Sequence, residues 1–294
     1  MQTDSPSSSM RHRVAPAWLA GLRLWRGITG APSGVRIMVL HDTPPGSLDT
    51  LRSLADVLNR DGTLCGPAAF ETACAADGPR YMLSFDDGFA SNLEAARTLA
   101  EAGVSALFCV CPALLDLDPA QQRAAMAKAF FAGGPVPEGC RLLSWNEVGE
   151  ISSLGHVIGA HGMTHARLTG LRGDELTREI ADAGTMIGER LGARPDWYAY
   201  SYGDIGSISA EALAVIARHY RYCRSGVRGI NTPATRQHAL RGEEFRLDAP
   251  PAYRHLVLEG GLDARYRDAR ASLDAMAASG TGAANQATGT ENHD

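Results

Sequence analysis

Short apolar runs alternate with stretches of helical periodicity between about residue 35 and residue 250. The runs typical of buried strands are VRIMVL (35–40), RYMLSF (80–85), SALFCVC (105–111), VIGA (157–160) and YRYCRSGV (220–227). Helices are expected over 47–60, 91–102, 176–191 and 209–219, where apolar residues recur every three or four positions. Strands that alternate with helices predict a parallel sheet and an α/β fold.

Serine followed three residues later by glutamate marks two helix starts. Ser91 with Glu94, and Ser144 with Glu147, match the capping box, in which each side chain bonds to the other residue's backbone N–H. Gly192 ends the apolar repeat that follows residue 176, as glycine commonly does at helix C-termini.

The 294 residues contain no internal repeat, and no linker interrupts the alternation. We therefore expect one folded domain over 35–270, preceded by an N-terminal tail, 1–34. Residues 1–10 are Ser-rich and polar, which predicts disorder at this end. Residues 271–294 are rich in Gly, Ala, Thr and Asn, a composition that predicts a disordered C-terminal tail.

Composition narrows the class of protein. A net charge of −5 gives no electrostatic reason to expect nucleic acid as a partner. The six cysteines form no CxxC pair and are expected to be reduced. The sequence shows neither a signal-peptide pattern nor an apolar stretch long enough to span a bilayer, so the expected location is the cytoplasm.

Charged and imidazole side chains follow three of the predicted strands. Asp86 and Asp87 come directly after RYMLSF, and such a pair at a buried strand end needs a proton, a metal or a basic partner, unless Asp-Asp-Gly is only a turn. His161 and His165 follow VIGA four residues apart, a spacing that suits one divalent ion, although two loop histidines would look the same. His41 follows VRIMVL beside an acid and is a candidate general acid, or else a capped strand-terminal histidine.

These motifs resemble, in order, those of the polysaccharide deacetylases, carbohydrate esterase family 4, which share the chitooligosaccharide deacetylase homology domain. SFDDG (84–88) is similar to the first family motif, T/S-F-D-D-G, and HGMTH (161–165) to the second, H-S/T-x-x-H. YAYSYG (198–203) resembles the third motif in its F-A-Y-P-Y-G form. The motif I-V-L-x-H-D, late in many members, is matched early by IMVLHD (37–42), so the chain resembles the circularly permuted branch of exopolysaccharide deacetylases.

The resemblance implies a distorted, seven-stranded (β/α) barrel with one site at the strand ends near 41, 86, 161 and 202. It implies that Asp87, His161 and His165 hold a divalent metal, most simply Zn²⁺, with Co²⁺, Ni²⁺ or Fe²⁺ as alternatives. By the same resemblance Asp86 is the base and His41 the acid.

The third motif and its surroundings supply the remaining assignments implied by the resemblance. The backbone N–H of Tyr202 would complete an oxyanion hole, and Tyr200 and Tyr202 would contact the substrate. His255 is a weaker competitor for the role of acid because no acidic residue follows it.

The chain departs from the family pattern at three positions. Gly162 replaces the Ser or Thr of the second motif, Ser201 stands in place of the usual Pro, and Ala199 occupies the position of an arginine that orients the base. We expect Arg246, or alternatively Arg241, to replace that arginine from another strand.

The leading functional prediction is a metal-dependent hydrolase that removes N-acetyl groups from amino sugars in a polysaccharide, oligosaccharide or lipid-linked glycan intermediate, using a metal-bound water. A deformylase or other small-amide hydrolase on the same barrel, and an inactive glycan-binding module, are the alternatives.

Residues 5–41 contain no Asp or Glu but several arginines, with Trp18, Leu22 and Trp25 at helical spacing. A basic amphipathic helix of this kind is typical of peripheral contact with the cytoplasmic membrane leaflet. The alternative is a helix packed across the bottom of the barrel with its arginines in solvent.

Overall fold

Seven parallel strands form one sheet in the computed structural model, which describes residues 6–287. The spatial order is β6-β5-β4-β3-β2-β1-β7, so the first strand lies between the second and the last. The strands are β1 (Gly34–Leu40), β2 (Pro79–Phe85), β3 (Leu107–Val110), β4 (Val157–Ala160), β5 (Trp197–Ala199), β6 (Tyr222–Arg224) and β7 (Gly242–Glu244).

The sheet nearly closes into a barrel through the residues that lead into β7. The Leu240 N–H donates to the carbonyl of Cys223 at 3.0 Å, and the Ser225 N–H donates to the carbonyl of Leu240 at 2.8 Å. These bonds join the edge strand β6 to the chain just before β7 at the other edge. The predicted α/β barrel is confirmed.

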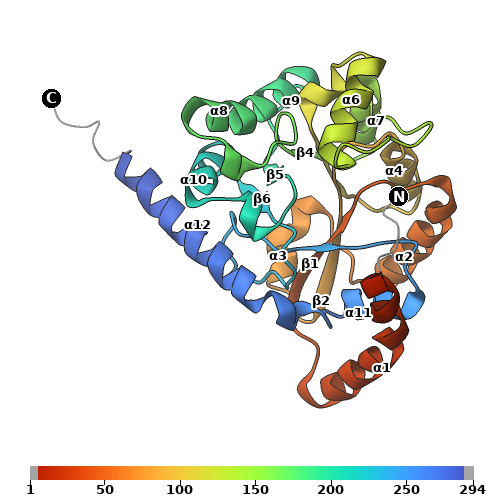
Figure 1. The fold of residues 1–294 in the computed structure, drawn as a ribbon. Helices are drawn as coiled ribbons and strands as arrows, with labels where there is room; N and C mark the ends of the chain where they lie inside the picture. The colour runs from red at the N-terminus through yellow and green to blue at the C-terminus, as the bar shows by residue number, and fades with distance from the viewer. Residues whose placement is uncertain (1–5, 288–294) are drawn as a thin grey trace.

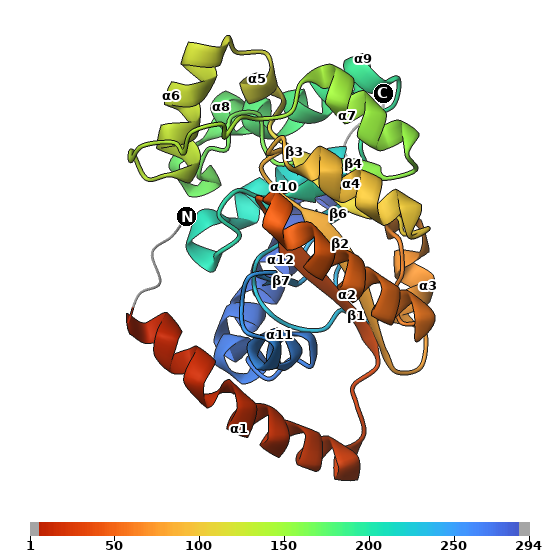
Figure 2. The same ribbon diagram turned by 90° about the vertical axis from the view of Figure 1, so that its right-hand side faces the viewer.

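Helices surround the sheet (Figures 1 and 2). They are α1 (Pro6–Thr29), α2 (Leu48–Arg60), α3 (Phe70–Cys74), α4 (Asn92–Glu101), α5 (Pro112–Leu115), α6 (Pro119–Phe130), α7 (Trp145–Ser153), α8 (Gly173–Thr177), α9 (Ala183–Leu191), α10 (Ala210–His219), α11 (Pro251–Leu258) and α12 (Arg267–Ala287). A π-helical turn, Arg178–Asp182, joins α8 to α9.

The predicted helix signals hold with one exception. Ser144 and Glu147 form the complete capping box of α7, and Gly192 ends α9 with a left-handed φ of 84°. Ser91 precedes α4 but does not cap it: its hydroxyl donates to Asp42 Oδ1 at 2.6 Å and accepts the Thr43 N–H. The prediction of a capping box with Glu94 was wrong because Ser91 instead ties α4 to the loop after β1.

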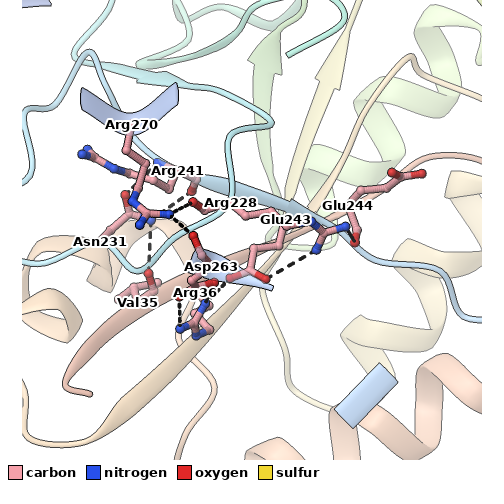
Figure 3. A network of polar contacts seen from close by, with 9 residues as sticks. All are labelled: Val35, Arg36, Arg228, Asn231, Arg241, Glu243, Glu244, Asp263 and Arg270. Carbon is pink, nitrogen blue, oxygen red and sulfur yellow. Dashed lines mark hydrogen bonds and ion pairs between the residues drawn. The ribbon is translucent and has the colours of Figure 1, made fainter. Parts of the chain in front are cut away.

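A buried polar network holds β1 against β7 at the end of the barrel where β1 begins (Figure 3). Arg36 on β1 pairs with Glu243 on β7, and its Nη2 lies 2.7 Å from Asp263 Oδ2. The Asn231 amide donates to the carbonyls of Val35 and Arg241. The network therefore ties β1 to β7 and to the segments that carry Asn231 and Asp263.

The helix α12 corrects the prediction of a disordered tail from residue 271. Its Leu273 and Ala277 are buried, it packs against α10, and Asp274 pairs with Arg241 at 2.6 Å. Two small apolar side chains at helical spacing and one ion pair therefore order a segment of tail-like composition. Residues 288–294, also expected in this tail, lie outside the described part, as do residues 1–5 of the predicted N-terminal tail. Residues 6–10 of that tail are not disordered but begin the helix α1.

The helix α1 lies on the outside of the molecule beside α11 (Figure 2). Ala15 and Leu19 are buried, and Arg23 Nη2 lies 2.7 Å from Glu259 Oε1. Across residues 6–287 no helix combines the length and apolar character needed to cross a bilayer.

Candidate active site

The carboxyl ends of four strands bring the predicted site residues together. His41 follows β1, Asp86 and Asp87 follow β2, His161 follows β4, and the turn containing Tyr202 follows β5. Because all strands run parallel, these residues lie at one edge of the sheet. Asp86, Asp87, His161 and His165 are buried, whereas His41 is exposed.

Asp87 and the two histidines form the cluster of potential metal ligands found among the described residues. Asp87 Oδ1 lies 3.3 Å from His161 Nε2 and 3.4 Å from His165 Nε2. One ligand atom from each of the three residues falls within 4.8 Å of the others. One carboxylate oxygen and two imidazole nitrogens are a donor set that suits Zn²⁺ or Fe²⁺ and leaves positions for other ligands.

Backbone contacts orient His161 toward this cluster. Its Nδ1 lies 2.7 Å from the Ala199 carbonyl, which fixes the proton on Nδ1 and leaves Nε2 as the atom facing Asp87. Burial opposes a charge on the ring, but the nearby carboxylates of Asp86 and Asp87 outweigh it and raise the pKa of His161. The small residue at 199 thus contributes its carbonyl to the site.

His165 is held between aromatic rings. Its ring centroid lies 4.8 Å from that of Phe130 and 4.7 Å from that of Tyr202. Burial, together with the charge of His161, lowers the pKa of His165 to about 4. The ring is therefore neutral at physiological pH, the state in which imidazole binds a metal.

Strained backbone concentrates at the site. Asp87, His165 and Tyr202 have φ values of 72°, 63° and 68°, and they are three of the four non-glycine residues with positive φ in the described chain. This left-handed region costs energy for residues with a Cβ, so such positions persist where the surroundings impose them. The loops are thus held in a conformation that aims these side chains at one point.

Arg224 on β6 is the arginine that contacts Asp86. Its Nη2 donates to Asp86 Oδ1, and both side chains are buried. Burial would raise the pKa of Asp86, but Arg224, followed by His161 and His41, lowers it, so the carboxylate stays ionised.

The expectation that Arg246 or Arg241 would contact Asp86 was wrong. Arg246 Nη2 lies 2.7 Å from Asp248 Oδ2 at the surface, and Arg241 pairs with Asp274 at the far end of the barrel. A signal for Arg224 was present in the sequence, because an arginine inside the apolar run YRYCRSGV has to be paired.

Glu179, in the π-helical turn, anchors the loop that carries both histidines. Its carboxylate accepts the Thr164 N–H at 2.9 Å, the Thr164 hydroxyl at 2.8 Å and the Ala166 N–H at 3.2 Å. Gly162 has a φ of 77°, and a Cβ there would meet Glu179 Oε1 at 2.6 Å. The glycine that departs from the family motif therefore makes room for a buried carboxylate, which sequence reasoning missed.

The two tyrosines of the third motif differ in position. Tyr202 is 46% exposed, with its ring against His165 and the Arg167 guanidinium 4.3 Å from its centroid. Tyr200 is buried and its hydroxyl donates to the Gly203 carbonyl at 2.9 Å, so it braces the turn. The predicted contact between Tyr200 and substrate disagrees with the structure, because the side chain lies in the core and its hydroxyl is bonded within the turn.

His41 lies close enough to the site for its charge to lower the pKa of both Asp86 and Asp87. His255, the competing candidate, is exposed on α11, outside the strand ends that form the site. The structure thus places an exposed histidine near the two carboxylates.

Among known sequences, the family model described as polysaccharide deacetylase matches residues 75–220. None of the curated proteins matches this sequence closely enough to count as a relative.

Solved structures share the fold. The Streptococcus pyogenes deacetylase PplD, in complex with acetate, is similar with a TM-score of 0.61 and 17% identity, over 76% of this chain and 97% of that one. IcaB from Ammonifex degensii is similar with a TM-score of 0.59 and 18% identity, over 80% of this chain and 98% of that one. The polysaccharide deacetylase BC0361 from Bacillus cereus has a TM-score of 0.59 and 16% identity, over 77% and 69% of the two chains.

Proposed function

Because the chain belongs to the polysaccharide deacetylase family, we propose that it is a metal-dependent hydrolase that removes N-acetyl groups from amino sugars of a glycan or glycan precursor. The observation that supports this most directly is the pairing of Asp86 with Arg224 directly beside the Asp87–His161–His165 cluster. An ionised carboxylate and a set of metal ligands lie together at the carboxyl ends of the strands. Metal-assisted hydrolysis of an unactivated amide requires both a general base and a metal site.

Asp87, His161 and His165 would hold the metal, for which we propose Zn²⁺. When bound, the ion supplies a Lewis acid that polarises an acyl oxygen and makes water more acidic. The buried ligands, the neutral His165 and the hydrogen bond from His161 to Ala199 all fit this assignment.

The chain's own groups handle the protons. Asp86, kept ionised by Arg224, takes a proton from the attacking water. His41 gives a proton to the departing nitrogen, which becomes the free amine of the sugar.

Tyr202 contributes to the oxyanion hole through its backbone. No hydrogen bond within the described chain uses the Tyr202 N–H, so this donor is available to the oxyanion that forms as water attacks. Its half-exposed ring lies at the mouth of the site, where it would contact a sugar.

The decisive experiment combines metal analysis of the purified protein with acetate release from N-acetylglucosamine oligomers. We expect bound Zn²⁺ and a loss of activity of about a hundredfold or more in Asp86→Asn and in His41→Ala, the usual effect of removing a general base or acid. His255→Ala is the matched control for His41→Ala, since it removes an exposed histidine away from the strand ends.

Three other results would contradict the proposed mechanism or indicate another function. Full activity of both Asp86→Asn and His41→Ala, with metal still bound, would refute the mechanism. Formate release from a formamido sugar, without acetate release, would indicate a deformylase. Absence of both metal and acetate would indicate a glycan-binding module.

A further inference from the structure

The helix α1 carries two apolar faces, of which only one is covered by the described protein. The inner face packs toward α11 through Ala15 and Leu19, and His12 makes an edge contact with Tyr253 at 4.8 Å between ring centroids. These residues recur at helical spacing, as expected for a helix seated on a domain.

The outer face holds most of the exposed large apolar side chains of the described chain. Nine such residues are exposed, and six of them lie on α1: Met10, Val14, Trp18, Leu24, Trp25 and Ile28. Trp25 is 63% exposed and Ile28 is 79% exposed. At 3.6 residues per turn these positions align along one side of the helix, opposite the inner face.

Packing against the barrel, the alternative interpretation of the basic segment, accounts for the inner face of α1 but leaves the outer face uncovered. Leu22 turns toward the core, and the Arg265 guanidinium lies 5.2 Å from the centroid of the partly exposed Trp18 ring, whereas Trp25 is 63% exposed. A contiguous apolar patch of this kind marks a binding surface.

Charge indicates what covers the outer face. Arg11 and Arg13 are exposed on either side of the apolar stripe, and neither forms an ion pair with a described residue. No Asp or Glu occurs between residues 5 and 41. A second copy of the chain on this face would therefore set arginine against arginine, whereas anionic headgroups complement them.

We propose that α1 lies on the surface of an anionic lipid bilayer, with its outer face among the lipids and Arg11 and Arg13 against the headgroups. Tryptophans beside an apolar stripe flanked by arginines are typical of helices that lie in the plane of a membrane interface. The proposal is independent of the reaction, since α1 contributes no residue to the catalytic cluster.

Flotation of the full chain with vesicles tests the proposal. We expect the wild type to float with phosphatidylcholine vesicles that contain phosphatidylglycerol, and less with phosphatidylcholine alone. The double substitution Trp25→Ser with Ile28→Ser should weaken partitioning about tenfold or more, because two apolar side chains no longer leave water. Arg11→Gln with Arg13→Gln should weaken binding about tenfold, and only on the anionic vesicles.

The matched control is Val57→Ser with Leu154→Ser, which removes one exposed apolar side chain on α2 and one directly after α7 and should leave flotation unchanged. Acetate release from soluble oligomers by the same preparations shows whether each variant is intact.

Three results would overturn the proposal. The first is no flotation of the wild type on either vesicle, and the second is flotation that Trp25→Ser with Ile28→Ser leaves intact. The third is self-association through this face without flotation, which would assign it to a second copy. None of these affects the proposed reaction, which the acetate assay tests separately.

Discussion

Glu179 touches neither the proposed substrate site nor the metal ligands directly, yet we predict that it sets the metal affinity of the enzyme. Its carboxylate holds the two residues that flank His165, Thr164 and Ala166, through three hydrogen bonds. His165 has a strained φ of 63°, and no described hydrogen-bond partner meets its Nδ1. The loop and the flanking rings of Phe130 and Tyr202, and not a hydrogen bond to its own Nδ1, therefore hold His165 in place.

The expected magnitude follows from those three bonds. Glu179→Ala leaves two backbone N–H groups and one hydroxyl without their acceptor, and bonds to a charged group contribute roughly 1.5–3 kcal/mol each. Thr164 is exposed, so water replaces part of the loss. We expect a net cost of about 2 kcal/mol in metal binding, which corresponds to a roughly thirtyfold weaker affinity.

Competition with a chromogenic chelator measures this affinity in the wild type, Glu179→Ala and Glu179→Gln. Glutamine keeps an oxygen that accepts the two N–H groups, so Glu179→Gln should bind Zn²⁺ within about threefold of the wild type. Equal affinities in Glu179→Ala and the wild type would refute the reasoning, even if the alanine variant unfolds at a lower temperature.

Three further predictions concern other parts of the barrel. Arg224→Met should reduce acetate release at least a hundredfold while Zn²⁺ still binds, because Asp86 loses the cation that keeps it ionised; a wild-type rate would contradict this role. Leu273→Ala should lower the free energy of unfolding in urea by about 2–4 kcal/mol, against no change for the exposed Ser272→Ala; equal effects would mean that α12 does not pack. Burial lowers the pKa of His156 below 6.5, so on acidification the unfolded chain binds a proton before the folded chain does. The free energy of unfolding should therefore fall as pH drops below about 6.5. His156→Gln should flatten this pH dependence in urea titrations at pH 5 to 7.5, and an unchanged slope would exclude His156 as its source.

The sequence predicts those parts of the site that depend on strand ends. Parallel strands deliver their last residues to one edge, so Asp87, His161 and His165 meet without any knowledge of packing. His41 joins them because β1 pairs with β2, the next strand in the chain, along its whole length.

Contacts across the barrel are not predictable from the sequence in this way. Arg224 reaches Asp86 only because β6 bonds to the chain before β7 and closes the sheet. Glu179 faces the histidine loop from a π-helical turn, where the usual 3.6-residue period no longer tells which side chains point inward. Composition did not predict α12, because the burial of Leu273 and Ala277 and the ion pair between Asp274 and Arg241 order a helix of mostly small residues.

The two ends of β1 have different roles: one end holds the barrel closed, and the other carries a residue of the candidate site. At one end, Arg36 ties β1 to β7 and to Asp263, with the arginine and Glu243 fully enclosed. His41 lies at the other end of the same strand, near Asp87, whose own backbone has a positive φ of 72°. Because β1 lies between β2 and β7, His41 at its end is held near Asp86 and Asp87, which follow β2. The position of a strand in the closed barrel, and not its place in the sequence, therefore determines which residues can act together.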